Sequence, residues 1–508
     1  MIEPRGFPPA AFFSLQIFVH LVQMERLTKN TLSALFGAGI FLFWLLAFPQ
    51  ALGLQEQNQL FLWSGSYAVE RLGMAGGLAD WLGEFITQFN CIPWLGALLL
   101  ALVSVAIQRM TWTTGDTRDI SWYPLSFIPS ALLLVHMGDH DVLPCLGMAV
   151  ILSLLLCLLY KKAGDNAAVA AIGIPAGLWL AGPAAWVFVI YVIVRKRSAR
   201  SLLWLAYSAA LVVTARFTLL QQYPWKQILL GFNYFRSPLV HPVLETVTIL
   251  SSVAVPAIIS ILPSFRKPLA TCIAVYAIIL CGTAFWVSRS YDRDTYEVIA
   301  YDQLVRNEKW DELVARAEKY QPHSNVSCVS LNLALFMTGN LERMFEFYQC
   351  GTEGLLMPNV RDYLSNTSTA EAFWRLGMVN SALRYSFDSQ ESIGNLRKSG
   401  RFMKRMAECQ IVNGRYKVAG KYLDILKQSL FYRNWAEEHE RFIMDETAVE
   451  TDPVYAYLRQ VRFEKDFLYY YPEMDKMLGI LYSQNKNNYM AGYYFMAWKQ
   501  LEQMEVKK

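Results

Sequence analysis

The two halves of the chain differ in how their hydrophobic positions are spaced. Residues 31–289 form a series of apolar runs of roughly 16–22 residues, and residues 290–508 mix apolar and polar positions as a soluble sequence does. A helix needs about 20 apolar residues to cross the hydrocarbon core of a bilayer. The pattern therefore predicts an all-α chain, with a polytopic membrane domain at 31–289 and a helical soluble domain at 290–508.

The apolar runs predict about nine membrane spans. They lie at 31–52, 93–108, 121–137, 142–160, 167–181, 183–194, 201–221, 243–263 and 268–288. Lys and Arg concentrate in the cytoplasmic loops of membrane proteins. If the end that carries Arg26 and Lys29 is inside, the inner loops contain most of the Lys and Arg residues that lie between the predicted spans, including the "RKRSAR" cluster. The C-terminal domain is then outside the inner (cytoplasmic) membrane, which in a Gram-negative cell is the periplasm.

The N-terminal segment, residues 1–30, is predicted to precede the membrane domain and not to form part of it. Residues 8–23 are apolar but short for a span, and "MERLTKN" from Met24 resembles a natural start with a basic flank. An over-long start explains this segment, and we predict no signal peptide in it.

Composition narrows the classes of function. The chain is 54% hydrophobic and 17% charged, and its net charge of +4 is too small to indicate a nucleic-acid partner. Its eight cysteines are scattered without a C-x-x-C pair, which disfavours a structural zinc site or a disulfide framework. Cys328 and Cys350 are a pair that an oxidising compartment would allow to bond.

The first outside loop, residues 53–92, has a helical pattern of its own. Its second half places large apolar residues on one helical face, while Asp80 and Glu84 fall on the other. Two interfacial helices are predicted, at 56–71 and 76–90, within an interfacial segment at 56–90. Simple anchoring at the membrane surface explains these helices as well as a functional site does.

Acidic residues follow the first and third spans. Glu56 comes just after the first, and the second outside loop, "HMGDHD", holds His136, Asp139, His140 and Asp141. Carboxylates spaced D-x-D suit Mg²⁺ or Mn²⁺, which prefer oxygen ligands, and histidines can transfer protons or act as softer ligands. A polar turn explains the same residues, and the spacing by itself favours the turn.

This layout resembles the C-type (GT-C) membrane glycosyltransferases, which use polyprenyl-phosphate-linked sugars. The matching features are Glu56 after the first span, the interfacial helix pair, the acidic second loop and an outside soluble domain, all within residues 31–290. The resemblance implies Glu56, Asp139 and Asp141 as catalytic residues, with Asp139 and Asp141 also binding a divalent cation. The chain departs from that family in the acid after the first span, where Asp is commoner than the Glu found here as Glu56. The chain is also similar to multi-span membrane proteins of Bacteroidetes bacteria.

In such an enzyme, basic side chains bind the lipid phosphate. The resemblance assigns substrate binding to His136, His140, Arg216, Arg236 and His241. Arg suits a phosphate because its planar guanidinium donates two parallel hydrogen bonds, and an ionisable group within a span tends to be functional. The alternative is that these side chains extend to the lipid headgroups.

A repeat is visible in the soluble half. An apolar-x-x-Tyr unit follows short polar breaks at Phe345/Tyr348, Ala382/Tyr385, Ala419/Tyr422 and Ala491/Tyr494, with tyrosines spaced 37, 37 and 72 apart. This period is close to that of the tetratricopeptide repeat (TPR). The sequence predicts a degenerate TPR-like α-solenoid, which would bind a protein partner. The alternative is an irregular helical bundle.

Two functions follow from these observations. One is a GT-C-like glycosyltransferase acting on a polyprenyl-phosphate sugar at the outer face of the cytoplasmic membrane. The other is a non-enzymatic scaffold, anchored among membrane lipids, whose repeats assemble a cell-envelope complex. The enzyme requires Glu56, Asp139 and Asp141 around one cavity near the outer surface, and the scaffold does not.

Overall fold

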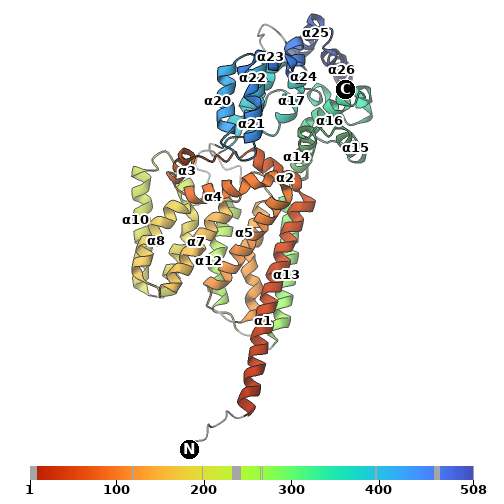
Figure 1. Cartoon of the computed structure of the whole chain (residues 1–508). Helices are drawn as coiled ribbons and strands as arrows, with labels where there is room; N and C mark the ends of the chain where they lie inside the picture. The colour runs from red at the N-terminus through yellow and green to blue at the C-terminus, as the bar shows by residue number, and fades with distance from the viewer. Residues whose placement is uncertain are drawn as a thin grey trace, which may run out of the picture.

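The computed structural model of this chain describes residues 9–116, 119–196, 198–230, 242–263, 265, 267–394, 397–462 and 470–506. Every regular element in these ranges is a helix, so the all-α prediction is confirmed. Figure 1 shows a bundle of long helices beneath a C-terminal helical domain, with α1 extending from the far side of the bundle.

The bundle corresponds to the predicted membrane domain. Its main helices are α1 (Pro9–Leu42), α5 (Pro93–Thr114), α6 (Ile128–His136), α7 (Cys145–Lys162), α8 (Ala167–Leu180), α9 (Trp186–Lys196), α10 (Leu202–Thr218), α12 (Pro242–Ile259) and α13 (Pro268–Ser290). In the described ranges, five helical segments are long and apolar enough to cross a membrane: Met24–Ala47, Pro93–Thr114, Cys145–Lys162, Ala199–Thr218 and Pro268–Ser290. The chain is therefore a helical membrane protein. Shorter apolar helices cover most of the other predicted spans, and the total of nine stays a prediction.

Buried polar side chains join three segments of the bundle. Ser33 of α1 donates to Gln108 Oε1 of α5 over 2.7 Å, and Gln108 Nε2 donates to Ser126 Oγ over 2.7 Å. Ser126 lies in the 3₁₀ helix η3 (Ile120–Phe127), which also contributes the Tyr123 hydroxyl, 2.7 Å from Ser33 Oγ. Helices within a bilayer associate partly through such polar contacts, because the apolar tails give side chains no other partner.

The end of the bundle farthest from the C-terminal domain carries an ion-pair network. Asp116, just after α5, lies 3.1 Å from Lys161 Nζ of α7 and 2.8 Å from Arg195 Nη1 of α9. Arg195 Nε also lies 2.6 Å from Asp165, before α8. These contacts fix the ends of three apolar helices where they leave the bundle core.

One of the two helices predicted in the loop 53–92 is interrupted in the structure. A single helix over 56–71 is wrong: the chain forms α2 (Pro49–Gln57) and α3 (Gly65–Leu72), with non-helical residues between them. Two backbone hydrogen bonds to the C-terminal domain explain the interruption, from Leu60 N to Lys398 O (2.7 Å) and from Trp63 N to Gln428 O (2.8 Å). The helix predicted at 76–90 is present as α4 (Gly77–Thr87), followed by the 3₁₀ turn η2 (Gln88–Cys91).

The polar and small residues of α4 face the protein. Ala79, Gly83, Glu84 and Thr87 are buried, while the aromatic residues on the other side of the helix are only half-buried. A Cβ atom on Gly83 would lie 2.5 Å from the Cys145 Cα, so glycine is what lets α4 approach α7 this closely. A helix with its polar side inward and its apolar side outward suits a position at the membrane surface.

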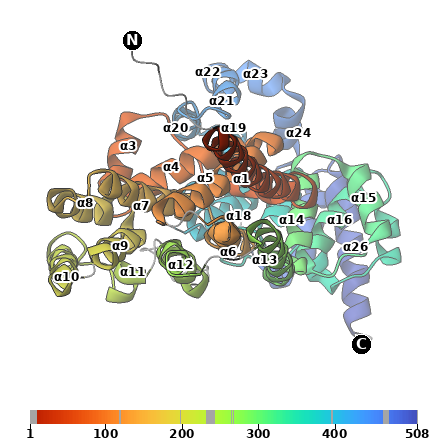
Figure 2. The same cartoon turned by 90° about the horizontal axis from the view of Figure 1, so that it is seen from below.

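The C-terminal domain is a stack of shorter helices. They are α14 (Arg293–Arg306), α15 (Trp310–Lys319), α16 (Asn325–Met337), α17 (Thr367–Arg375), α18 (Val379–Ser392), α19 (Gly400–Val412), α20 (Tyr416–Leu426), α21 (Arg433–His439), α22 (Arg441–Met444), α23 (Glu446–Thr451), α24 (Pro453–Val461), α25 (Met474–Gln484) and α26 (Tyr489–Val506). Helices α17 to α20 each pack on the next in the chain. The view from below shows α15, α16 and α26 reaching beyond α13, so this domain overhangs the bundle (Figure 2).

The repeat units differ in their local structure. Ala382, Ala419 and Ala491 are fully buried where helices meet, as small residues of helical repeats are. The first unit is different: Phe345 lies in the 3₁₀ helix η6 (Leu341–Glu346), and Tyr348 is 52% exposed. A TPR-like solenoid therefore stays a prediction.

Candidate functional site

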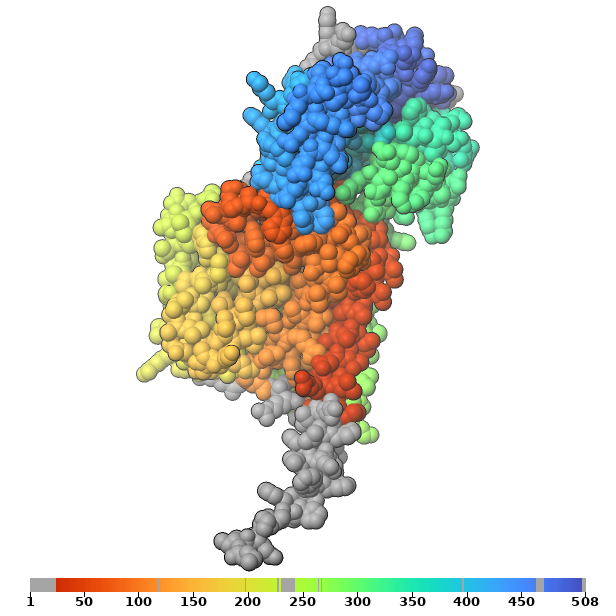
Figure 3. Space-filling model, in the orientation of Figure 1, coloured from red at the N-terminus to blue at the C-terminus, as the bar shows by residue number. Residues whose placement is uncertain are grey.

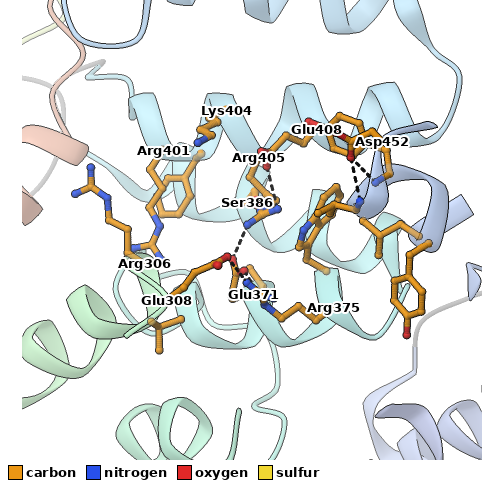
Figure 4. A pocket seen from close by; sticks show the side chains of 18 of the residues that line it. Arg306, Glu308, Glu371, Arg375, Ser386, Arg401, Lys404, Arg405, Glu408 and Asp452 are labelled. Carbon is orange, nitrogen blue, oxygen red and sulfur yellow. Dashed lines mark hydrogen bonds and ion pairs between the residues drawn. The ribbon is translucent and has the colours of Figure 1, made fainter. Parts of the chain in front are cut away.

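The C-terminal domain contains a cavity of about 680 Å³, called here the groove. Its walls come from the end of α14 and from α16, α17, α18, α19, α21, α22, α24 and α26 (Figure 4). In Figure 3 the blue part of this domain, which includes α19 to α24, rests on the orange first outside loop. The groove therefore belongs to a domain that is supported directly by the membrane bundle.

Helices α17 and α19 supply a network of ion pairs to the groove. Arg405 Nη2 lies 2.6 Å from Glu371 Oε2, and its Nη1 lies 2.9 Å from Glu408. Glu371 also lies 3.3 Å from Arg375, one turn along α17. Burial opposes ionisation of Glu371, but the guanidinium groups of Arg405 and Arg375 outweigh it and lower the pKa of this carboxyl. The network therefore stays charged and joins the two helices.

Two other cations of the groove meet aromatic rings. Lys404 Nζ lies 4.9 Å from the centre of the Trp435 ring, and the Arg441 guanidinium lies 4.5 Å from that of Phe442. In the described ranges, no carboxylate lies within ion-pair distance of Lys404 or Arg441. His439 stacks on Trp435, with ring centres 3.9 Å apart, and burial lowers its pKa to about 4. At neutral pH this part of the groove combines the two positive charges with uncharged aromatic rings, and its Asp452 carboxylate accepts the backbone N–H groups of Val454 and Tyr455.

A buried hydroxyl also faces the groove. Ser386 of α18 is 1% exposed and lines the cavity, where Figure 4 places it beside Arg405 and Glu371. Its Oγ atom has no hydrogen-bond partner among the described residues. Leaving a buried hydroxyl without a partner is unfavourable by about 1–3 kcal/mol. A polar group of a bound ligand, or a water molecule, would satisfy it.

Glu56 reaches the groove wall from the membrane domain. It lies in the last turn of α2, is 3% exposed, and its Oε2 atom lies 3.5 Å from Arg306 Nη2. Burial raises the pKa of Glu56, although the nearby Arg306 charge and the Tyr432 hydroxyl oppose the rise. Both Arg306 and Tyr432 line the groove. A carboxyl group with a raised pKa therefore lies directly behind the groove wall.

Arg401 joins the same loop to the C-terminal domain. Its Nη1 atom donates to Asp302 Oδ2 of α14 over 2.6 Å and to Gln57 Oε1 of α2 over 3.0 Å. Asp302 is 2% exposed, and Arg401 lines the groove. One guanidinium group thus fixes α19, α14 and α2 relative to one another.

The second outside loop docks on the C-terminal domain as a turn. Asp139 Oδ1 accepts the Asp141 backbone N–H over 3.0 Å, and Asp141 Oδ1 accepts the Tyr363 hydroxyl over 2.6 Å. The two ring nitrogens of His140 lie 4.0 Å from Asp139 Oδ1 and 3.9 Å from Asp141 Oδ2. The Tyr296 hydroxyl also donates to the Gly138 carbonyl over 3.3 Å. Asp139 thus stabilises the turn, and Asp141 attaches it to the soluble domain.

The two outside loops meet beside the groove. Gln55 Nε2 donates to the Val142 carbonyl over 3.1 Å, so the residues next to Glu56 and Asp141 are in contact. Each of these two carboxylates then turns to its own partner in the C-terminal domain, Arg306 for Glu56 and Tyr363 for Asp141. The structure brings the two loops into contact, and the shared catalytic cavity stays a prediction.

The other predicted site residues are more dispersed. His136 is buried in the last turn of α6. Arg216 lies on α10, which packs on α8, α9 and α11 (Trp225–Leu230), and its guanidinium is 5.8 Å from the Trp225 ring. Figure 1 shows α10 and α2 on opposite sides of the bundle. Arg236 and His241 lie outside the described residues.

The turn does not test the predicted cation site. Mg²⁺ requires six ligands in near-octahedral geometry. In Asp139 and in Asp141, one carboxylate oxygen already accepts a hydrogen bond. In the part of the chain that the structure describes, no group of three or more His, Cys, Asp or Glu side chains is placed to hold a metal ion. The cation site stays a prediction from the D-x-D spacing.

The groove residues form no distinctive motif in the sequence. Glu371 and Arg375, like Arg401 and Arg405, are four apart, which places each pair on one face of its helix. Charged pairs at that spacing are typical of solvated helix surfaces. Only the packing of α17 against α18 and of α18 against α19 turns these faces toward a common cavity.

These features define a class: an all-α membrane protein in which the loop 53–92 supports a grooved helical domain at one end of the bundle. The chain belongs to the DUF6057 family, described as a family of unknown function, which matches residues 25–503. No curated protein and no solved structure matches the chain.

Proposed function

We propose that this protein is a membrane-anchored binding protein that holds an acidic segment of a protein partner in its groove. The observation that carries the proposal is the pair Lys404 and Arg441, whose charges meet aromatic rings and no described carboxylate. Carboxylates of a ligand would form ion pairs with these two cations, and its apolar side chains would pack on Trp435 and Phe442. The ion pairs of Arg401 and Arg405 keep the walls in place without using these cations.

We also propose that the groove binds its partner outside the cytoplasmic membrane. In this proposal the five long helices and the shorter apolar ones make nine spans, and the groove is on the opposite side of the membrane from the basic ends of α7 and α9. Lys161, Lys162, Arg195 and Lys196 at those ends favour the cytoplasm. The C-terminal domain then lies outside the cytoplasmic membrane. A reporter active only outside the cytoplasm, fused after Lys508, should work, and fluorescence from a cytoplasm-only fusion would contradict this topology.

Peptide binding to the purified full-length protein tests the proposed ligand. A fluorescent Asp/Glu-rich peptide containing one Trp should bind, and a Lys-rich peptide of equal length should not. Lys404→Glu combined with Arg441→Glu should weaken binding of the acidic peptide at least tenfold, and the affinity should fall with added salt because the attraction is between charges. Lys309→Glu, at an exposed position outside the groove lining, is the matched control and should leave binding unchanged. Equal binding of both peptides would refute the proposal.

A second candidate is the GT-C-like glycosyltransferase, and Glu56 is the observation that favours it. A carboxyl group whose pKa is raised by burial is a better proton acceptor near neutral pH, and Arg306 beside it suits a phosphate. In this function, Glu56 would take a proton from an acceptor hydroxyl while groove cations bind the polyprenyl phosphate. The carboxylates of the second loop would position the substrate, with a divalent cation if one is required.

Two substitutions separate the candidates. Glu56→Gln removes the proton acceptor but keeps the shape, so the enzyme function predicts loss of sugar transfer in reconstituted membranes. The binding function predicts that the same variant keeps its affinity for the acidic peptide. Asp141→Asn should likewise abolish transfer if that loop is catalytic. Full transfer activity in both variants would remove these residues from a catalytic site.

A further inference from the structure

Two cysteines of the C-terminal domain lie in direct contact. Cys328 is in the first turn of α16, and Cys350 immediately precedes the 3₁₀ helix η7 (Gly351–Gly354). Their Sγ atoms are 3.5 Å apart, and both are free thiols. A disulfide bond is about 2 Å long, so the sulfurs need to approach by only about 1.5 Å, which side-chain rotation supplies. All eight cysteines lie in the described ranges, and no other pair of them has a recorded contact.

The surrounding contacts hold the two thiols together before any bond forms. Asn332 Nδ2, on the next turn of α16, donates to the Gly354 carbonyl over 2.8 Å and to Gln349 Oε1 over 3.1 Å. A Cβ atom on Gly354 would lie 3.2 Å from Cys328 Cβ and 3.5 Å from Cys350 Cβ, so the glycine leaves room for both side chains. The segment that carries Cys350 is therefore fixed against α16 independently of the sulfurs.

We propose that Cys328 and Cys350 form a thiol–disulfide modification site that is oxidised to a disulfide in the cell. The oxidant is of the disulfide-exchange class, a partner that itself carries a reactive disulfide. The Cys350 thiolate, which is partly exposed, attacks one sulfur of that disulfide and forms a mixed disulfide. The buried Cys328 then attacks the Cys350 sulfur, releasing the partner as a dithiol that has gained the two electrons and two protons.

The bond would strengthen one wall of the groove. It would tie the segment 347–354, which ends with η7, to α16, and the last turn of α16 contributes Phe336 and Met337 to the groove lining. The inference rests on the proposed location of this domain outside the cytoplasm, since thiols there meet an oxidising environment. It does not depend on which ligand the groove takes.

Tryptic digestion followed by mass spectrometry tests the proposal, because Arg343 lies between the two cysteines. Cleavage places Cys328 in peptide 320–343 and Cys350 in peptide 344–361. In one arm, thiols are blocked in intact cells before the full-length protein is extracted. In the other, the reduced purified protein is equilibrated with oxidised glutathione. The expected result in both arms is the two peptides linked, with a mass two hydrogens below their sum, as the predominant form.

The outcomes are distinguishable. Linked peptides in the glutathione arm alone would overturn the disulfide in the cell, and the C-terminal reporter fusion would then show whether the proposed location has failed as well. Linked peptides in neither arm would overturn the site even if the reporter places the domain outside. Cys350→Ser, at the partly exposed position, should abolish the linked form. Cys409→Ser, at a buried cysteine elsewhere in the same domain, should leave the linked form unchanged.

Discussion

Replacing Arg401 by Met should loosen the junction between the C-terminal domain and the first outside loop. The change removes the 2.6 Å hydrogen bond to Asp302 and the 3.0 Å hydrogen bond to Gln57. The Asp302 carboxylate, which is only 2% exposed, then loses the cation beside it. Both hydrogen bonds come from the charged guanidinium, and a hydrogen bond to a charged group contributes about 1.5–3 kcal/mol. The Arg401 side chain is itself 16% exposed, so water can partly replace it. We therefore expect a loss of about 3 kcal/mol.

Hydrogen exchange of the full-length protein in detergent measures this loss locally. A loss of about 3 kcal/mol corresponds to roughly a hundredfold increase in the opening equilibrium. The amides of α2 and of the segment that contains Leu60 should therefore exchange about a hundred times faster in Arg401→Met. Lys309→Met is the matched control: Lys309 and Glu312 are 50% and 61% exposed, and such pairs contribute at most about 1 kcal/mol.

A second substitution tests the physical reason. Asp302→Asn in the Arg401→Met background removes the buried charge that was left without a partner. Exchange in the double variant should therefore be slower than in Arg401→Met alone, because an unpaired buried charge is less favourable than a neutral amide. The reasoning is refuted if Arg401→Met exchanges like the Lys309→Met control, or if the double variant exchanges faster than the single one.

Three further changes probe other parts of the structure. Tyr363→Phe removes the 2.6 Å hydrogen bond to Asp141, which is about one-fifth exposed, so thermal unfolding should show a loss of about 1–2 kcal/mol; an unchanged midpoint would contradict the docking of the second loop. Gly83→Ala places a Cβ atom 2.5 Å from the backbone of α7 and should lower stability by about 1–3 kcal/mol. Gly65→Ala, which meets open space, should show no such loss. Burial raises the pKa of Asp80 to about 7, so the folded state binds this proton more tightly than the unfolded state. That stabilisation is complete below pH of about 4 and is lost as pH rises through about 7. The thermal midpoint of Asp80→Asn relative to that of the wild type should therefore rise between pH of about 4 and about 7 and stay constant above about 7, and a difference that does not change over this range would contradict this assignment.

The sequence by itself determined the local structure of most of the chain. The length and spacing of apolar runs decide whether a segment is a long apolar helix, so the five segments that can cross a membrane lie where runs were predicted. The same holds for α4, because the period of its large apolar residues is that of a helix and needs no information from the rest of the chain. The spacing of Asp139 and Asp141 also favoured a turn, and a side-chain-to-backbone hydrogen bond forms one there.

Only the tertiary structure decided what the two outside loops do. Residues 58–64 leave the helical conformation because their amides find carbonyl partners at Lys398 and Gln428, which no local pattern announces. Glu56 follows its span as predicted, but its partners Arg306 and Tyr432 come from two distant helical segments. The groove has the same origin. Its charged residues carry the pattern of solvated helix faces, and only the packing of α14, α17, α19 and α24 directs them into one cavity, because contacts between distant segments leave no trace in local periodicity.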